Sequence, residues 1–139
     1  MPVQMDLRRI ITSSSEAHDQ HVIQLREAEG GERSFHIVIG LFEVSSIERR
    51  VKGIPSPRPL THDLLANAIE QMGGELRDVF INDLREGTYF AKLRIRQNGE
   101  MIEVDCRPSD AIALAVTAKV PIFVAEEVLE EACADNNPF

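Results

Sequence analysis

A pattern of strand, tight turn, strand and helix occurs twice in this chain of 139 residues. The first copy has strands at HVIQLREA (21–28) and SFHIVIG (34–40), joined by a turn with two glycines. The second has strands at TYFAKLRIRQ (88–97) and GEMIEVDC (99–106), joined through Asn98-Gly99, a dipeptide typical of two-residue hairpins. Apolar and polar residues alternate in these strands, which indicates that one face is buried. The sequence therefore predicts two hairpins, each followed by a helix.

The two helices that follow these hairpins correspond at an offset of 67 residues. The first is predicted in FEVSSIERRVKG (42–53), where apolar residues have helical spacing and Gly53 is a stop signal. The second is predicted over 108–119, and Glu43 corresponds to Asp110, so a carboxylate opens each helix at the same place. If the two helix N-termini faced one cleft, their dipoles would make it an anion site.

The remaining segments complete an α+β fold in one domain, with a mixed or antiparallel sheet around the two hairpin–helix units. A chain of this length suits one domain, expected here over 1–132 with a C-terminal tail at 133–139. Further strands are predicted at 5–12, 78–82 and 121–124, and further helices at 61–74, with Thr61 as N-cap, and 125–132.

The net charge of −8 argues against a general affinity for nucleic acid, because neutralisation of phosphates supplies most non-specific binding. The segment RRVKGIPSPRP (49–59) is a local exception, since it contains four basic side chains and no acid: Arg49, Arg50, Lys52 and Arg58. These cations could bind nucleic acid, or they could only complement the C-terminal dipole of the helix before them.

The N-terminal sequence MPVQMDLRRI lacks an apolar stretch of signal-peptide length, and no apolar run approaches the ~20 residues needed to cross a bilayer. Cys106 and Cys133 lie in different contexts and do not resemble a disulfide framework. We therefore expect free thiols and a cytoplasmic protein without membrane association.

Charge is concentrated where the strand ending at Cys106 meets the next helix, in Asp105, Arg107 and Asp110. Pro108 suits the first helical position, which would place Asp110 near the third; alternatively Ser109 is the N-cap. Either way Asp110 has a structural role at the helix start. In a phosphodiester site, the two carboxylates would also hold a divalent cation such as Mg²⁺ or Mn²⁺, and Arg107 would bind a phosphate bidentately.

His62 and Asp63 form a second candidate site, in the first turn of the helix that follows the proline-rich linker. A histidine beside a carboxylate could act as general acid or base near neutral pH, although such residues are often only surface residues. His62 follows the basic segment directly, so it would meet whatever Arg58 binds.

Several blocks of this sequence resemble the bifunctional nuclease domain family: IGLFEVSSI (39–47), RPLTHDLL (58–65), VDCRPSDAIALAV (104–116) and PIFVAEEVLEEA (121–132). These blocks occur in the family's order, and the resemblance covers most of residues 5–132. It implies a compact α+β domain that is often self-associated, and a nuclease that cleaves both RNA and DNA.

The resemblance and the basic linker together suggest a metal-assisted phosphodiesterase. Asp105 and Asp110, with Glu43, would bind the ion or position water, and His62 and Asp63 would transfer protons. The cations would hold the nucleic acid: Arg107 and Arg58 at the phosphate, and Arg49, Arg50 and Lys52 along the track.

Two other classes of function remain open. The net charge favours a non-catalytic module that binds or regulates another protein, in which the helix-capping residues are only caps. A small-molecule enzyme could instead use the same helix N-termini to bind a phosphate or carboxylate. We also expect a homodimer, because the Ala-rich helix at 108–119 and the strand PIFV have few polar residues.

Overall fold

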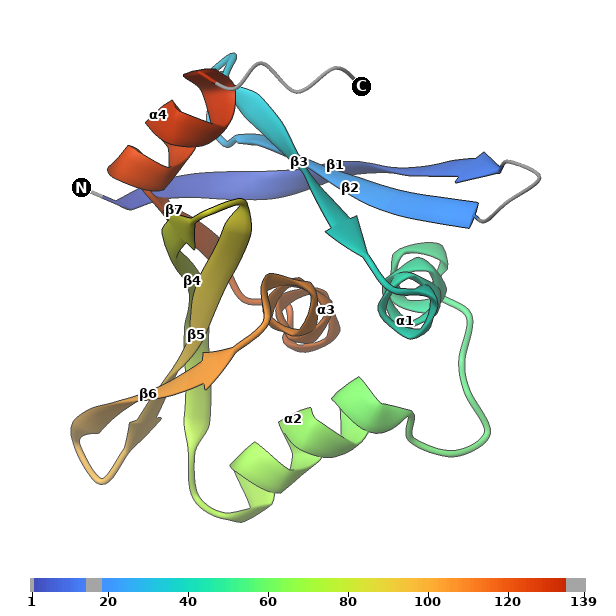
Figure 1. Ribbon diagram of the computed structural model, residues 1–139. Coiled ribbons are helices and arrows are strands. Elements are labelled where there is room, and N and C mark those ends of the chain that lie inside the picture. The colour runs from blue at the N-terminus through green and yellow to red at the C-terminus, as the bar shows by residue number, and fades with distance from the viewer. Residues whose placement is uncertain (1, 15–18, 135–139) are drawn as a thin grey trace.

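The strands of the two predicted hairpin–helix units form the opposite ends of one seven-stranded sheet. The structure is a computed structural model that describes residues 2–14 and 19–134 (Figure 1). The sheet order is β3-β2-β1-β7-β4-β5-β6, antiparallel throughout except for the parallel pair β4–β7. The elements are β1 (Pro2–Ser14), β2 (Asp19–Glu27), β3 (Ser34–Ile39), α1 (Leu41–Lys52), α2 (Thr61–Gln71), β4 (Glu75–Arg85), β5 (Thr88–Gln97), β6 (Glu100–Cys106), α3 (Pro108–Ala118), β7 (Ile122–Ala125) and α4 (Glu126–Ala134).

The central strand β7 joins the two units, because β1 pairs with one of its edges and β4 with the other. Ile122 lies opposite Met5 of β1 and Val79 of β4, and all three side chains are buried. The helices α1 and α3 occupy equivalent places in the two units and begin 67 residues apart, at Leu41 and Pro108. The predicted α+β class and the mixed sheet are confirmed.

Helix α3 forms the centre of the hydrophobic core. Figure 1 shows it end-on, with strands above it and to its left, α1 to its right and α2 below. Five consecutive residues, 111–115, are buried, and three of them are alanines that allow neighbouring elements to approach closely. Burial of Ile112 and Leu114 stabilises the fold by roughly 1.5–3 kcal/mol each.

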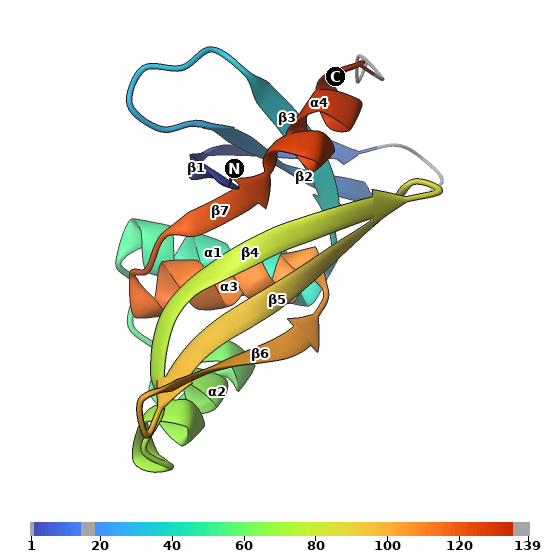
Figure 2. The same ribbon diagram turned by 90° about the vertical axis from the view of Figure 1, so that its left-hand side faces the viewer.

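The apolar character of α3 and β7 is therefore used inside a single chain. Val124 and Ala125 of β7 are buried against the same core as α3. Most of the apolar residues of these two segments, on which the expected homodimer rested, are thus buried within the chain, and Figure 2 shows α3 behind β4 and β5. The dimer itself stays a prediction.

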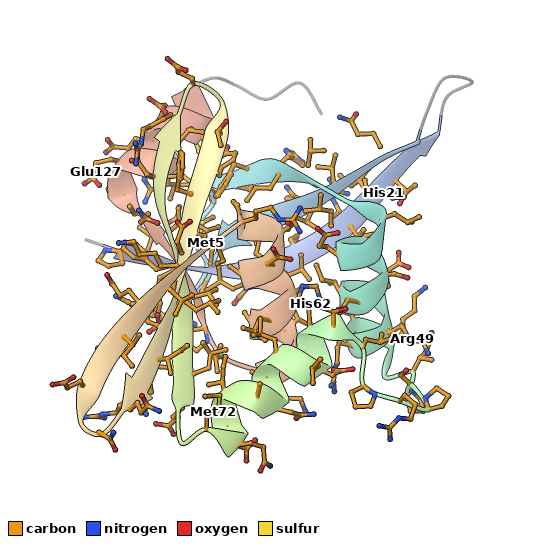
Figure 3. All side chains as sticks on the ribbon, turned by 60° about the horizontal axis from the view of Figure 1, so that its bottom comes forward. Met5, His21, Arg49, His62, Met72 and Glu127 are labelled. Carbon is orange, nitrogen blue, oxygen red and sulfur yellow. The ribbon has the colours of Figure 1, made fainter. Side chains whose placement is uncertain are left out.

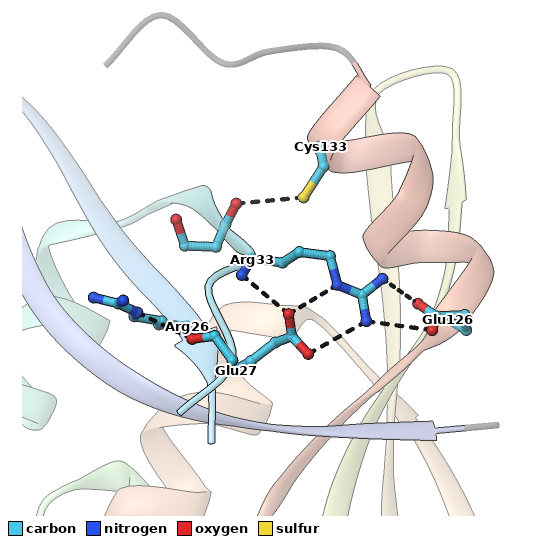
Figure 4. Close-up of polar contacts among 7 residues, drawn as sticks. Arg26, Glu27, Arg33, Glu126 and Cys133 are labelled. Carbon is cyan, nitrogen blue, oxygen red and sulfur yellow. Dashed lines mark hydrogen bonds and ion pairs between the residues drawn. The ribbon is translucent and has the colours of Figure 1, made fainter. Parts of the chain in front are cut away.

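Ion pairs attach α4 to the first unit. Arg33, in the loop before β3, donates from Nε to Glu27 Oε1 at 2.8 Å and from Nη1 to Glu126 Oε2 at 2.7 Å (Figure 4). Cys133 Sγ lies 3.6 Å from the backbone oxygen of Ser34 in the same region. One guanidinium thus links the turn between β2 and β3 to the first turn of α4.

Three boundaries differ from the sequence predictions. Strand β4 is longer than the predicted 78–82, because it pairs with β5 along Glu75–Arg85. Leu60, and not Thr61, is the N-cap of α2. Helix α3 begins as in the first of its two predicted alternatives, with Pro108 as the first helical residue and Arg107 as the N-cap. Helix α4 continues to Ala134, and residues 135–139 of the predicted tail lie outside the described residues. In the part of the chain that the structure describes, no helix has the length and hydropathy needed to cross a bilayer.

Candidate active site

Arg107 connects the first turns of the two repeated helices. Its Nη2 donates to Glu43 Oε1 at 2.7 Å, and its Nε donates to Asp110 Oδ2 at 3.0 Å. Glu43 is the third residue of α1 and Asp110 the third of α3, so the predicted correspondence of these carboxylates places both on one guanidinium. The helix dipoles favour negative charge at both positions. The arrangement therefore fixes one edge of Arg107 between two carboxylates.

The other edge of Arg107 is open. The Glu43 side chain is 8% exposed, whereas that of Arg107 is 69% exposed. Among the described residues, Nη1 makes no hydrogen bond. A guanidinium that is held at one edge and solvated at the other can bind an external phosphate without a large loss of side-chain entropy.

His62 approaches the same carboxylate from α2. Its Nε2 lies 3.1 Å from Asp110 Oδ1, and its side chain is 9% exposed. Figure 3 shows His62 at the start of α2, where this helix approaches α1 and α3. If Nε2 carries the proton, it donates to Asp110, and Nδ1, which has no hydrogen-bond partner in the described ranges, is left as an acceptor. Asp110 would then set the tautomer and the orientation of the imidazole.

The environment of Asp110 keeps its carboxyl group ionised. Burial alone would raise the pKa of Asp110, but the hydrogen bonds from Arg107 and His62 outweigh that effect and place the pKa below its ordinary 3.8. Asp110 therefore acts as a fixed negative charge that Arg107 and His62 share, and it is a poor proton donor at neutral pH.

Asp63 contacts different residues from those that its neighbour His62 contacts. It forms an ion pair with Arg50 of α1 and accepts the backbone N–H of Leu60 at 3.0 Å. The hydrogen bond from Arg50 is the main reason that the pKa of Asp63 is lowered. Asp63 therefore caps α2 and fixes the position of α1, and both roles help to place His62. Its predicted part in proton transfer stays a prediction.

Cations surround a cavity next to His62. A cavity of about 340 Å³ is lined by Arg49, Arg50 and Arg58, among other residues. An adjoining cavity of about 390 Å³ shares Ser46, Arg49 and Leu60 with it and reaches His62. The basic segment and the histidine thus belong to one continuous depression, and Figure 3 shows Arg49 at the end of α1 on this side. Arg58 lines the first of these cavities, but Asp110 lines neither of them, and Lys52 is exposed outside both.

Asp105 lies apart from the other predicted acidic residues. It is exposed and faces Lys92 in the register between β5 and β6. Ala91 and Leu93, on either side of Lys92, are buried, so alternation directs Asp105 away from the core that contains α3. Within residues 2–14 and 19–134, no group of three or more His, Cys, Asp or Glu side chains is placed to hold a metal ion.

Ser46 is a site residue that the sequence analysis missed. It is buried and lines both cavities beside His62. Its position was readable from the sequence, because residues 43, 46 and 50 follow helical spacing and share one face of α1. Glu43 and Arg50 were singled out, and the serine between them faces the same way.

The chain is similar to known proteins over most of its length. The family model described as the bifunctional nuclease domain matches residues 23–137. An uncharacterized protein of Mycobacterium tuberculosis is 45% identical over 114 residues, which cover 82% of this chain and 67% of that protein. Bifunctional nuclease 2 of Oryza sativa subsp. japonica is 33% identical over 112 residues, covering 78% of this chain but 34% of that protein. Bifunctional nuclease 1 of Arabidopsis thaliana is 37% identical over 70 residues, 48% of this chain and 22% of that protein.

Proposed function

The chain belongs to the bifunctional nuclease domain family, and from this premise we propose that it hydrolyses phosphodiester bonds of RNA and DNA. The chain spans 34% of the rice protein and 22% of the Arabidopsis protein, so their activity comes to it only through this proposal. The observation that supports the proposal is the arrangement of His62, Asp110 and Arg107 at one point, with arginines beside it.

Each side chain has a defined role in the proposed reaction. Arg107 binds the phosphate through its open edge, and Asp110 holds both Arg107 and His62. His62 Nδ1 accepts a proton from the nucleophile. Since DNA has no 2′-hydroxyl group, a mechanism common to both polymers cannot use that group as the nucleophile, and the nucleophile proposed here is water. The water oxygen bonds to phosphorus, the bond to the leaving sugar oxygen breaks, and that oxygen takes a proton from solvent.

The cationic depression would hold the neighbouring phosphates. The chain as a whole carries a net charge of −8, so binding must depend on a local cluster of cations. Arg49, Arg50 and Arg58 form such a cluster next to His62, whereas Lys52, which was also predicted to bind nucleic acid, is exposed outside it. Part of the charge of Arg50 is already neutralised by Asp63. Arg49 and Arg58 are therefore the main candidates for phosphate contacts.

The predicted metal donors do not fit one divalent ion in this geometry. Oxygen ligands from Glu43 and Asp110 suit Mg²⁺ or Mn²⁺ by their chemistry, but the guanidinium of Arg107 occupies the space between them. Asp105 is directed away from the core that contains α3, so its carboxylate cannot join those of Glu43 and Asp110 around one ion. The proposed reaction therefore uses only side chains and water, and a requirement for Mg²⁺ or Mn²⁺ stays a prediction that a chelator can test.

A non-catalytic module that binds or regulates another protein is the alternative that the net charge favours. On this view the ion pairs of Glu43, Arg107 and Asp110 only fix α1 against α3. The same experiment decides between the two functions. The cytoplasmic location is also a prediction, tested by fractionation.

The test measures cleavage of end-labelled single-stranded RNA and DNA by the wild type and by two variants, His62→Ala and Asp6→Asn. Asp6 is exposed on β1, so Asp6→Asn is the control for the effects of substitution and of contaminating nucleases. Loss of a general base lowers the rate by about 10²–10⁴-fold, so cleavage by His62→Ala should fall at least 100-fold while Asp6→Asn retains the wild-type rate. Parallel reactions with EDTA report any metal requirement. Cleavage that persists in His62→Ala, or is absent from the wild type with and without added Mg²⁺ or Mn²⁺, contradicts the proposal.

A further inference from the structure

A third cavity lies on the other side of Arg107 from His62. Its volume is about 660 Å³, within the ~300–1,000 Å³ typical of small-molecule sites. It is bounded by residues 36–40 of β3 and its end, by the β4–β5 turn, and by the start of α3 with Arg107 and Ser109. We call it the β3 cavity. Arg107 thus stands between this cavity and the His62–Asp110 pair.

Strand β3 is an edge strand of the sheet, and its residues 36–39 line this cavity. It is the terminal strand of the sheet and pairs with β2 alone among the described strands. The backbone N–H and C=O groups on the outer edge of such a strand are available to an external partner. They offer the alternating donors and acceptors that the hydrogen-bonding edge of a nucleobase requires.

An aromatic ring also lines the β3 cavity. The ring of Tyr89 packs against that of Phe35, with centroids 5.6 Å apart, and this contact fixes its orientation. Val38, which also lines the cavity, is 59% exposed although it is aliphatic. Fixed aromatic rings and aliphatic surface next to a phosphate-binding arginine are the elements with which proteins hold unstacked bases.

We propose that the β3 cavity holds one unpaired nucleobase of a single-stranded substrate whose adjoining phosphate lies on Arg107. The inference rests on the proposed function for the identity of the polymer. A base within a duplex is stacked and paired, so it cannot enter the cavity. The substrate class is therefore single-stranded RNA or DNA.

The contacts of Asp110 support a nucleotide over a peptide as the occupant, because this carboxylate binds both Arg107, which lines the β3 cavity, and His62, which lines the other cavity. A peptide strand could pair with β3, but it would not carry a phosphate to Arg107 at every residue. A polynucleotide can use both, with its base in the β3 cavity and its next phosphates passing towards His62 and the arginines.

The experiment measures binding in a His62→Ala background, so that cleavage does not interfere. Fluorescence anisotropy gives the dissociation constants for a labelled single strand, the same strand with one abasic position, and the matching duplex. Val38→Trp fills the cavity, and Val51→Trp is the matched control, because Val51 is 62% exposed on α1 and lines none of these cavities. We expect the single strand to bind at least ~10-fold more tightly than the duplex, and Val38→Trp to weaken only the single strand by about 10-fold.

The outcomes separate this inference from the proposed function. If these binding differences are found but the wild type cleaves nothing, the base site stands and the nuclease proposal fails. If the wild type cleaves but Val38→Trp binds the single strand as tightly as Val51→Trp does, the base site is refuted and the edge of β3 is left for a protein partner. Equal affinity for single strand and duplex, or no binding of either, also overturns the inference.

Discussion

The side chains of Glu43 and Arg107 meet although 64 residues separate them in the sequence, with Arg107 Nη2 2.7 Å from Glu43 Oε1. One belongs to the first hairpin–helix unit and the other to the second. Their contact joins the starts of α1 and α3 and gives the candidate site its geometry.

The pair should show energetic coupling. Glu43 is buried, so loss of Arg107 would leave its charge without a partner and destabilise the fold, by about 1–2 kcal/mol given how exposed the arginine is. We expect Arg107→Met to lower the free energy of unfolding more than Glu43→Gln does. The double variant should be less destabilised than the sum of the two, with a coupling energy of about 1 kcal/mol from urea denaturation. Additive effects would contradict the ion pair.

The same variants report on catalysis. Glu43 touches no substrate in the proposed reaction, so it is a positioning residue that acts through Arg107. Glu43→Gln should raise KM for a single-stranded substrate by about 10-fold and leave kcat less affected, because Arg107 is less well held. Glu48→Gln on the same helix is the control. A purely structural role would instead lower the fraction of active enzyme and leave KM unchanged.

Stability should depend on Asp110 at acid pH. The pKa of Asp110 is lowered in the folded protein, so its ionised form is favoured more strongly there than in the unfolded chain. The stabilisation is complete above the unfolded pKa of about 3.9 and is lost as the pH falls through the lower folded value. Asp110→Asn should therefore lose less stability than the wild type between pH 5 and pH 2, as followed by thermal unfolding. Parallel curves for the two proteins would count against the environment described for Asp110.

Asp63 should stabilise α2 through the Leu60 amide. Asp63→Ala removes the acceptor for this N–H and the partner of Arg50, and should cost about 1 kcal/mol. Asp63→Asn keeps an acceptor oxygen and should recover part of that loss. Chemical denaturation of both variants, with far-ultraviolet circular dichroism, measures the difference. If Asp63→Asn is as destabilised as Asp63→Ala, the ion pair rather than the cap carries the stabilisation.

Much of this arrangement could be predicted from the sequence, because it depends on local patterns. Alternation gave the hairpins, and the repeat gave the correspondence of Glu43 and Asp110, which the structure places on one guanidinium. The same alternation accounts for the outward position of Asp105, although the sequence analysis grouped this residue with Asp110 at a metal site. These conclusions need only the periods of strands and helices and the signals at their ends.

What the sequence could not supply is the set of contacts between distant segments. Strand β7 inserts between β1 and β4, and nothing local in PIFV indicates either neighbour. The ion pair of Arg107 with Glu43 and the approach of His62 to Asp110 depend on how α1 and α2 pack on α3. Leu60 replaces Thr61 as N-cap because the Asp63 side chain captures the Leu60 amide, a choice that helix-start statistics do not fix.

Cys106 should be unreactive in the folded protein. Burial raises the pKa of its thiol to about 12, with further contributions from the carboxylates of Asp110 and Asp105. Only about one thiol in 10⁴ would then be ionised at pH 8, and the thiolate is the reactive form. Alkylation by iodoacetamide at pH 8, resolved by peptide mass spectrometry, should leave Cys106 unmodified until guanidinium unfolds the chain. Equal rates in the native and unfolded states would contradict the half-buried position of Cys106 at the end of β6.

Salt dependence should distinguish Arg58 from Lys52. Arg58 lines the cavity beside the His62 depression, whereas Lys52 is exposed outside it. Each phosphate neutralised on a single strand contributes about −0.7 to the slope of log K against log salt concentration. Arg58→Gln should therefore reduce the slope by nearly one such increment, measured by anisotropy in the His62→Ala background, while Lys52→Gln leaves it almost unchanged. Because both substitutions remove one positive charge, an equal effect of the two would show that binding follows net charge and not the shape of this cavity.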